Sequence, residues 1–200
     1  MFFVEGNIGV GKSTLVKELE GRGLATLQEP AAAWESVVNQ NGKNVLQEFY
    51  DDPKKWAYAF QSIAFRSRII GMKDLPTGCI VERSVYTDRM VFAETAHEAG
   101  NISPIEWDDY TGWFDFVMNM CNVSPMGIIY LRGSPTTCMN QIKTRGRPGE
   151  ENITLDYLKQ LHAKHDKWLL EEPNVLVLDI DKMDRATFAD RIIDFVSRES

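Results

Sequence analysis

The residues best suited to chemistry begin near the start of the chain, in the run EGNIGVGKSTLVKELE at residues 5–20. The run matches the pattern glycine, four residues, glycine, lysine, serine, which binds nucleotide phosphates when it follows a strand and opens a helix. Backbone N–H groups and the helix N-terminus then hold the phosphate, the lysine reaches the outer phosphates, and the serine ligates magnesium. A glycine-rich turn with an exposed lysine is the alternative. The predicted nucleotide-binding residues are Gly6, Asn7, Ile8, Gly9, Val10, Gly11, Lys12, Ser13 and Thr14.

Charged side chains follow two further apolar runs. Glu29 ends the second run, in QEP, and Glu82 and Arg83 end the third, in ERSVYTDRMVFA. Ligands of open α/β sheets collect at such strand ends, so a carboxylate there can act as a base or a metal ligand, and an arginine can clamp phosphate. A solvated charge at Glu29, and an ordinary ion pair at the start of a helix for Glu82 and Arg83, remain the alternatives.

A predicted helix over residues 53–73 carries two polar side chains on an apolar face. Gln61 and Arg68 are seven residues apart and therefore share the face that holds Ala64. A buried guanidinium needs a carboxylate such as Asp88, and a buried amide suits the edge of a nucleobase. From the pattern alone, both side chains could instead reach solvent along the helix surface.

The elements that must position these residues alternate between strand and helix. Because buried strands separated by helices need crossover connections, we expect one α/β domain over residues 1–200, with a parallel sheet flanked by helices. Ser103, Pro104 and Glu106 predict the start of one helix, and Ser134 with Pro135 predicts the start of another. The five predicted strands are residues 1–5, 24–28, 79–82, 127–131 and 174–179.

Three other segments carry weaker signals. Residues 144–152, TRGRPGEEN, are predicted to form a mobile loop. Residues 107–121 read as a helix packed in the core through a stripe at helical spacing. In LHAKHDKW, His162 and His165 lack a metal partner and are expected on a solvated helix face. The members of the stripe are Trp113, Phe114, Val117 and Cys121.

Bulk composition excludes several classes of protein. The 22 basic and 29 acidic residues give a net charge of −7, which argues against binding to a nucleic-acid polymer. Cys79, Cys121 and Cys138 are too few and too scattered for a disulfide framework or a zinc site. Since no apolar run is long enough to cross a bilayer and no cationic leader precedes the first strand, we expect a cytoplasmic protein without membrane partners.

Taken in order along the chain, these motifs resemble the deoxynucleoside kinase family, in particular its deoxycytidine and deoxyguanosine kinase branch. The resemblance covers nearly the whole chain and implies a P-loop kinase fold with an arginine-rich lid at about residues 144–152. The segments that carry it are GNIGVGKST, QEP followed by Trp34, NVLQEFY, FQSIAFRSR, ERSVYTDRMVFA, RGRPGEEN and LDYLKQLHAKHDKWL.

The resemblance implies roles for individual residues. It implies that Lys12, Glu29 and Arg83 act in catalysis, with Glu29 as the general base at the nucleoside 5′-hydroxyl. It also implies that Ser13 and Glu82 hold Mg²⁺. The substrate-binding residues implied are Glu29, Trp34, Tyr50, Phe60, Gln61, Arg68, Arg83, Asp88, Phe92 and Glu150.

Within that set, Gln61 would pair with the base edge, and Phe60 and Phe92 would pack on its ring. Tyr50 and Glu150 would bind the sugar 3′-hydroxyl. The lid arginines Arg145 and Arg147 would close over the phosphates of the donor nucleotide.

The pair Arg68 and Asp88 matches the branch that accepts deoxycytidine and purine deoxynucleosides, so these acceptors should be preferred over thymidine. Two departures leave questions open. Pro148 and Gly149 precede the lid acids, so Glu151 competes with Glu150 for the sugar. Gln141 stands where relatives place an arginine against the donor base, so ATP and UTP both remain candidate donors.

Two other functions share parts of this pattern. A nucleoside monophosphate kinase of the thymidylate kinase type has the same phosphate loop and lid, but needs extra cations for the acceptor phosphate. A non-catalytic nucleotide-binding subunit would not need Lys12, Glu29, Arg83 and both lid arginines together. From the resemblance we also expect a homodimer.

Overall fold

The computed structural model describes residues 1–121 and 123–199. Within these residues the strands lie side by side in the order β2-β3-β1-β4-β5, and every neighbouring pair is parallel. The predicted α/β fold with a parallel five-stranded sheet is confirmed. The strands are β1 (Phe2–Glu5), β2 (Thr26–Leu27), β3 (Ile80–Glu82), β4 (Gly127–Arg132) and β5 (Val175–Asp179).

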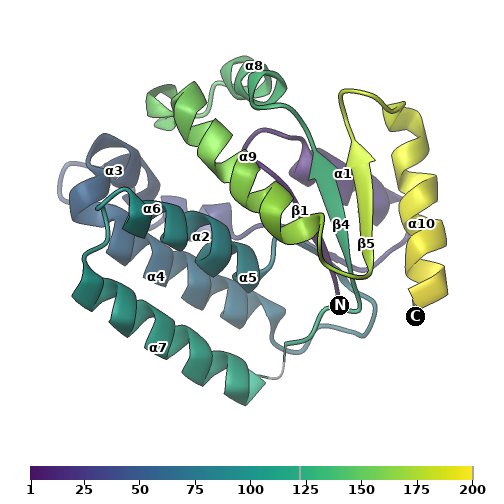
Figure 1. Cartoon of the computed structure of the whole chain (residues 1–200), viewed down its shortest axis with the longest axis horizontal. Coiled ribbons are helices and arrows are strands. Elements are labelled where there is room, and N and C mark those ends of the chain that lie inside the picture. Colours follow the sequence, from purple (N-terminus) through teal and green to yellow (C-terminus); the bar gives the residue numbers. More distant parts are fainter. Residues whose placement is uncertain (122, 200) are drawn as a thin grey trace.

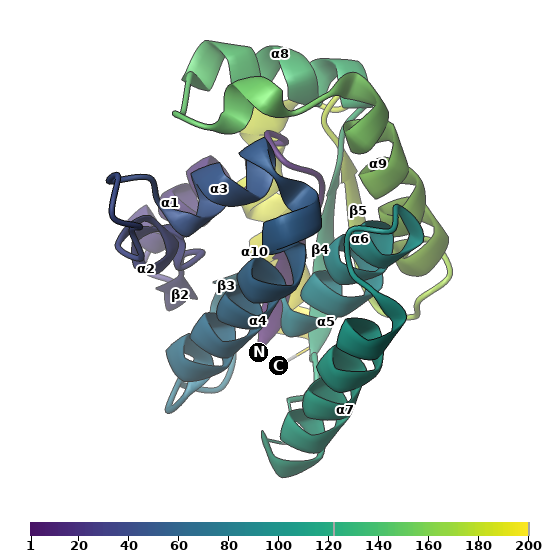
Figure 2. The same cartoon turned by 90° about the vertical axis from the view of Figure 1, so that its left-hand side faces the viewer.

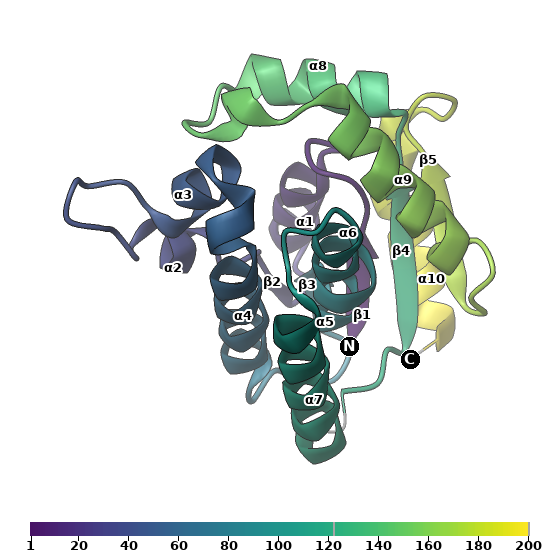
Figure 3. The same cartoon turned by 60° about the vertical axis from the view of Figure 1, so that its left-hand side comes forward.

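Long helices cover both faces of the sheet. Helices α1 (Lys12–Gly21) and α10 (Phe188–Glu199) lie behind it in Figure 3, while α4 (Pro53–Met72) and α9 (Leu155–Leu169) lie in front. Helix α7 (Pro104–Cys121) packs outside α4. Among the described residues, no helix combines the length and the apolar character needed to cross a bilayer.

The remaining helices connect these layers. They are α2 (Ala31–Glu35), α3 (Val45–Asp51), α5 (Val85–Thr87), the π-helix η1 (Asp88–Ala93), α6 (Glu94–Glu98), α8 (Pro135–Arg145) and the 3₁₀ helices η2 (Glu150–Asn152) and η3 (Arg185–Thr187). Helix α8 passes over the end of the sheet at which the strand arrowheads point, whereas α7 lies at the opposite end (Figures 1 and 2).

The apolar core follows the alternation of side chains along β1. Phe2 and Val4 pack with residues of α1 and α10, and Phe3 packs with residues of α4 and α7. Since all three side chains are fully buried, β1 has helices on both faces. The continuous apolar character of this run therefore reflects burial on two sides rather than one.

The predicted helix starts are confirmed. The backbone N–H of Ser103 donates to Glu106 Oε2 at 2.8 Å, and Ser103 Oγ accepts from the backbone N–H of Glu106 at 3.4 Å. Ser134 Oγ accepts from the backbone N–H of Thr137 at 3.2 Å, and Pro135 is the first residue of α8. These contacts satisfy N–H groups that have no partner inside the helix.

The predicted core stripe of α7 is wrong in part. Phe114 is buried and Val117 is half-buried, but Trp113 is 58% exposed and Cys121 is exposed. Adjacent residues of an α-helix point about 100° apart, so Trp113 and Phe114 cannot both face α4. The other two cysteines, Cys79 and Cys138, are buried, and none of the three forms a disulfide.

The predicted solvated face at the two histidines is wrong for His165. Its ring is fully buried, lies parallel to the Tyr130 ring at 6.2 Å, and donates from Nδ1 to the Leu161 carbonyl at 2.7 Å. Burial, helped by the positive charge of Arg83, lowers the pKa of His165 to about 3. His165 is therefore a neutral packing residue, while His162 is half-buried and contacts Asp166.

Candidate functional site

A cavity of about 780 Å³ lies at the carboxyl ends of the strands, between α4 and α8. Ligands of open parallel sheets bind at this edge. The cavity brings together most of the residues that the sequence singled out. Those that line it are Ile8, Gly9, Gly11, Lys12, Ser13, Thr14, Glu29, Trp34, Tyr50, Phe60, Gln61, Arg68, Glu82, Arg83, Asp88, Phe92, Arg145, Arg147 and Glu150.

Three predicted nucleotide-binding residues, Gly6, Asn7 and Val10, do not line the cavity. Val10 is buried in the core, and Asn7 Nδ2 donates to the Leu158 carbonyl at 2.9 Å. A Cβ on Gly6 would stand 2.3 Å from the Leu131 carbonyl oxygen. These residues therefore shape the loop and tie it to α9 and β4, instead of facing a ligand.

The Lys12 side chain folds back onto the backbone of the phosphate loop, residues 6–13. Its Nζ donates to the carbonyls of Gly6 at 3.0 Å and Asn7 at 2.9 Å, and the residue is 5% exposed. Burial, together with the nearby Arg83, lowers the pKa of Lys12 to about 7. A phosphate group placed in the loop would favour the charged form of this amine.

Ser13 and Glu82 meet at the start of α1. Ser13 Oγ donates to Glu82 Oε1 at 2.6 Å, and Glu82 Oε2 accepts from the backbone N–H of Glu29 at 3.3 Å. A hydroxyl and a carboxylate are hard oxygen donors of the kind that Mg²⁺ prefers, with waters and phosphate oxygens completing its octahedron. Their chemistry fits the predicted magnesium site.

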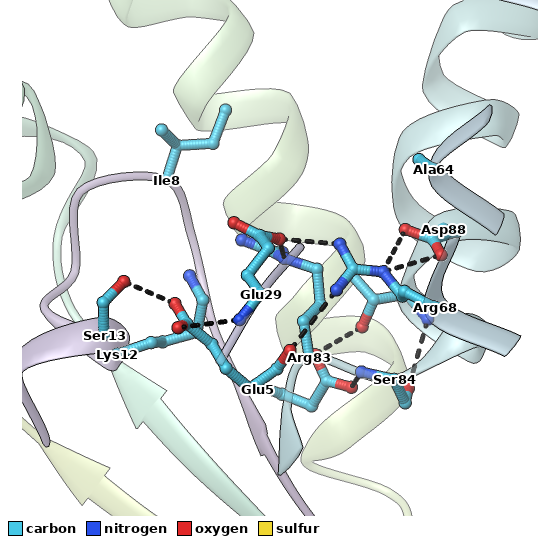
Figure 4. A network of polar contacts seen from close by, with 12 residues as sticks. Glu5, Ile8, Lys12, Ser13, Glu29, Ala64, Arg68, Arg83, Ser84 and Asp88 are labelled. Carbon is cyan, nitrogen blue, oxygen red and sulfur yellow. Dashed lines mark hydrogen bonds and ion pairs between the residues drawn. The ribbon is translucent and has the colours of Figure 1, made fainter. Parts of the chain in front are cut away.

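Glu29 lies between two arginines (Figure 4). Its Oε1 accepts from Arg68 Nη2 at 2.6 Å and from Arg83 Nε at 3.0 Å. Burial would raise the pKa of this carboxyl, but the positive charges of Arg83, Arg68 and Lys12 outweigh it and hold the pKa well below its usual value. The carboxylate is therefore ionised at neutral pH.

Arg83 adopts an unusual backbone conformation. Its φ of 68° lies in the left-handed region that residues with a Cβ rarely occupy. The guanidinium stands 4.7 Å from the Phe92 ring centroid, and among the described residues its buried Nη1 has no hydrogen-bond partner. Strain of this kind collects at functional sites, and an unpaired buried donor is suited to an anion in the cavity.

The predicted pairing of Arg68 with Asp88 is confirmed. Arg68 Nε donates to both Asp88 carboxylate oxygens, at 3.0 and 2.8 Å, and both residues are buried. Burial raises the pKa of Asp88 to about 6, although Arg68 opposes the shift. Asp88 belongs to the π-helix η1, a distortion that often marks functional sites.

Gln61 lies on the same face of α4 as Arg68, as predicted, and both line the cavity. Gln61 is 1% exposed, and the surface that it retains belongs to the cavity. An amide offers two donors and an acceptor, so one in the cavity wall is able to read the edge of a planar heterocycle.

Aromatic rings form one wall of the cavity. Trp34 packs edge-to-face on Phe60 at 5.5 Å between centroids, and Trp34 Nε1 donates to Ser67 Oγ at 2.9 Å. Phe49, which the sequence analysis did not single out, stacks behind Phe60 at 4.9 Å. Such a wall offers flat apolar surface to a ring placed beside Gln61.

The segment predicted as a mobile loop comprises the end of α8, a turn and η2. Arg145 Nη2 pairs with Glu150 Oε1 at 2.7 Å, and Arg147 reaches Glu150 and Glu35 at 3.8 Å each. Glu150 is 4% exposed, whereas Glu151 is exposed. Both arginines line the cavity, and each one pairs with a carboxylate of the protein itself.

The sequence analysis missed several residues around the cavity. Glu5 is fully buried and accepts from the Ser84 backbone N–H at 2.8 Å and from Thr87 Oγ1 at 2.5 Å, which fixes the chain just after Arg83. A carboxylate at the end of an apolar strand was the available signal. The other missed residues that line the cavity are Lys17, Gln28, Ala31, Leu46, Thr137, Asn140 and Thr144, whereas Ala64 and Gln141, which the sequence analysis named, line it as well.

Comparison with known proteins shows which family the chain belongs to. A family model described as deoxynucleoside kinase matches residues 2–199. The chain is 37% identical to deoxycytidine kinase 2 of Gallus gallus, over 97% of this chain and 89% of that protein. It is 37% identical to a probable deoxycytidine kinase of Fowlpox virus (strain NVSL), over 97% and 87%, and 36% identical to deoxycytidine kinase of Homo sapiens, over 90% and 83%.

Proposed function

The chain belongs to the deoxynucleoside kinase family, phosphotransferases of nucleoside salvage, and from that premise we propose its acceptors and the roles of its residues. The enzyme transfers the γ-phosphoryl group of ATP to the 5′-hydroxyl of deoxycytidine, deoxyadenosine or deoxyguanosine, in preference to thymidine. The 5′-oxygen forms a bond to the γ-phosphorus as the bond to the β-bridging oxygen breaks. The hydroxyl proton passes to Glu29, and ADP leaves.

The observation that carries this acceptor preference is the buried Asp88 carboxylate, which lines the same cavity as the Gln61 amide. An ionised carboxylate only accepts hydrogen bonds. Cytosine and adenine carry an amino donor at the position where thymine carries a carbonyl oxygen, whereas deoxyguanosine is included because of the resemblance to the deoxycytidine and deoxyguanosine kinase branch. A base that turns a carbonyl oxygen toward Asp88 would bring an acceptor against a buried carboxylate, which already pairs with Arg68 and has no proton to donate.

Glu29 orients the hydroxyl rather than ionising it in advance. A carboxylate of pKa about 4.3 faces an alcohol near 15.7, a gap of roughly 15 kcal/mol, and the arginines lower the pKa of Glu29 further. Phosphoryl transfer through a loose transition state needs little nucleophile ionisation before attack. Proton transfer to Glu29 therefore comes late, when the attacking oxygen has become acidic.

Most of the rate enhancement comes from cations around the transferring group. Lys12, Arg83, Arg145 and Arg147 stabilise the charge that spreads over the phosphate oxygens, and each good contact contributes a few kcal/mol in a dry site. Ser13 and Glu82 would hold Mg²⁺, which neutralises phosphate charge when bound. To contact the phosphates, Arg145 and Arg147 release Glu150 and bind the donor nucleotide instead.

Tyr50 and Glu150 receive the sugar. Burial raises the pKa of Tyr50, with Tyr157 and Glu150 adding to the effect, so its hydroxyl stays protonated and able to donate. Between the two lid acids, the burial of Glu150 supports the assignment of Glu150 to the 3′-hydroxyl. Phe60 and Phe92, which both line the cavity with Trp34, pack on the base ring.

The decisive experiment measures initial rates with the four deoxynucleosides and their ribose counterparts, using ATP and UTP in parallel. We expect deoxycytidine or a purine deoxynucleoside to give the highest kcat/KM. Thymidine as the best acceptor would overturn the acceptor preference. The ATP and UTP arms settle the donor, which the neutral Gln141 in the cavity wall leaves open.

Supplying nucleoside monophosphates in the same assay separates this proposal from the thymidylate kinase alternative. We expect no phosphorylation of a monophosphate, since its phosphate would meet the Glu29 carboxylate, with which Arg68 and Arg83 already pair.

We also propose a homodimer that forms through α7. Trp113, Phe116 and Met120 are 58, 55 and 70% exposed, and helical spacing places them on one side of that helix. Exposed apolar patches on this scale mark interaction surfaces. The cytoplasmic location remains a prediction from the sequence.

A further inference from the structure

Arg68 connects the base-reading side of the cavity to its reacting end. Its Nε donates to Asp88, its Nη1 donates to the Glu82 carbonyl at 3.3 Å, and its Nη2 donates to Glu29 Oε1 at 2.6 Å. Figure 4 shows these contacts radiating from one guanidinium. All three of its nitrogens are therefore used by protein oxygens.

The guanidinium is held rigidly. The Arg68 side chain is 4% exposed, and its Cζ stands 5.4 Å from the Trp34 ring centroid. A guanidinium is planar, stays protonated, and presents its donors in a fixed fork. With the other contacts in place, the direction in which Nη2 points at Glu29 is fixed as well.

The two oxygens of Glu29 differ as a result. Oε1 accepts from both Arg68 and Arg83, whereas Oε2 has no hydrogen-bond partner within the described residues. Glu29 also lines the cavity. One oxygen is thus anchored by two cations, and the other is available to a ligand.

We propose that Arg68 is a positioning residue for Glu29, in addition to any part it takes in base selection. By engaging Oε1 it presents Oε2 to the 5′-hydroxyl, and it links base binding at Asp88 to the group that receives the proton. The proposal rests on the assignment of Glu29 as the proton acceptor. No other described side chain donates hydrogen bonds to both Asp88 and Glu29.

Two variants isolate the contact between Arg68 and Glu29. Asp88→Asn alters base recognition but keeps that contact, whereas the double variant Arg68→Gln/Asp88→Asn removes it without leaving a buried carboxylate unpaired. We expect kcat with saturating deoxycytidine, and with each other accepted nucleoside, to be at least about tenfold lower in the double variant than in Asp88→Asn. Equal kcat values in the two variants would overturn the proposal.

A direct titration gives a readout that does not need turnover. With ¹³C-labelled glutamate carboxyl groups, NMR follows the Glu29 carboxyl as the pH is lowered, and a Glu29→Gln spectrum assigns its signal. Loss of Arg68, one of the three cations that lower the pKa of Glu29, should move the Glu29 titration to higher pH in the double variant than in Asp88→Asn. Unchanged titration would contradict the inference even if no nucleoside were phosphorylated, so its failure is distinct from failure of the proposed function.

Conservative replacement supplies the remaining control. Arg68→Lys keeps a charge but cannot reach both carboxylates in a fixed geometry, so its kcat should lie between those of the wild type and the double variant. Arg66→Gln makes a matched change at an exposed position of the same helix and should leave kcat unchanged. A kcat for Arg68→Lys equal to that of the wild type would show that charge alone suffices and would also overturn the proposal.

Discussion

At the scale of single residues, the site depends on carboxylates and cations that hold one another in the absence of a ligand. Glu29 is 20% exposed, and Arg83 and Arg68 hold its pKa low. A group with such a low pKa is a weak base, yet it is always ready to accept a hydrogen bond. Its contribution to catalysis is therefore position and late proton acceptance.

Replacing Glu29 with glutamine tests this role. Glu29→Gln preserves the shape of the side chain but removes its capacity to take a proton, so we expect kcat to fall by at least about a hundredfold with little change in nucleoside KM. Steady-state kinetics with the best nucleoside measures both constants. The exposed Glu20→Gln is the matched control. Near-normal turnover of Glu29→Gln would remove Glu29 from the mechanism.

Lys12 links nucleotide binding to pH. The pKa of Lys12 is lowered to about 7 in the empty site, and bound phosphate would raise it, so binding above pH 7 takes up a proton. Nucleotide affinity should therefore fall as the pH rises above 7, by at most about tenfold per pH unit. Calorimetry in buffers of different ionisation enthalpy measures the proton uptake. Lys12→Arg, which stays charged, should lose this component.

At the scale of elements, the lid is held against α3 by a close approach at Gly149. Its φ is +93°, and a Cβ there would stand 2.9 Å from Gln47 Cγ and 3.3 Å from Gln47 Cα. Gln47 is itself fixed by the capping box that it forms with Asn44 at the start of α3. Glu150, the residue proposed for the sugar, follows Gly149 directly.

Alanine at position 149 should therefore displace the sugar-binding carboxylate. Gly146→Ala is the matched control, because Gly146 also has a positive φ, +62°, but a Cβ there would meet nothing within 4 Å. We expect kcat/KM for the nucleoside to be roughly tenfold lower in Gly149→Ala than in Gly146→Ala. Equal effects would mean that backbone strain, and not the contact with Gln47, governs the lid.

Most elements could be predicted because their signals are local. The apolar run at residues 1–5 and the proline-led helix at residues 53–73 correspond to Phe2–Glu5 and Pro53–Met72. The π-helix η1 could not be predicted, since its hydrogen bonds depend on packing rather than on propensity. The same holds for the left-handed conformation of Arg83 and the burial of His165, which follow from contacts with distant segments.

At the scale of the whole molecule, sequence patterns predicted which residues meet but not how much of each helix is covered. The spacing of Gln61 and Arg68 placed them on one face, and the parallel sheet carried Glu29, Glu82 and Lys12 to a shared edge. Which side of α7 packs on α4 could not be read from its apolar residues alone, because they surround the helix. The exposed side is the one proposed for dimer formation.

A charge on that exposed side should dissociate the dimer. Phe116→Glu introduces a carboxylate at a position that would be buried between two copies, so sedimentation velocity should show the mass of one chain where the wild type shows two. Leu170→Glu is the matched control, since Leu170 is 52% exposed and follows α9 rather than α7. A wild-type mass of one chain would contradict the proposed dimer.

The distribution of the thiols makes the protein convenient for site-specific labelling without any mutation. A maleimide dye added to the native protein should attach once per chain, at Cys121, whereas denaturant should release all three thiols for reaction. Mass spectrometry counts the attached groups. A dye at that position would sit at the end of α7, so energy transfer between donor- and acceptor-labelled chains would report how close two copies come in solution.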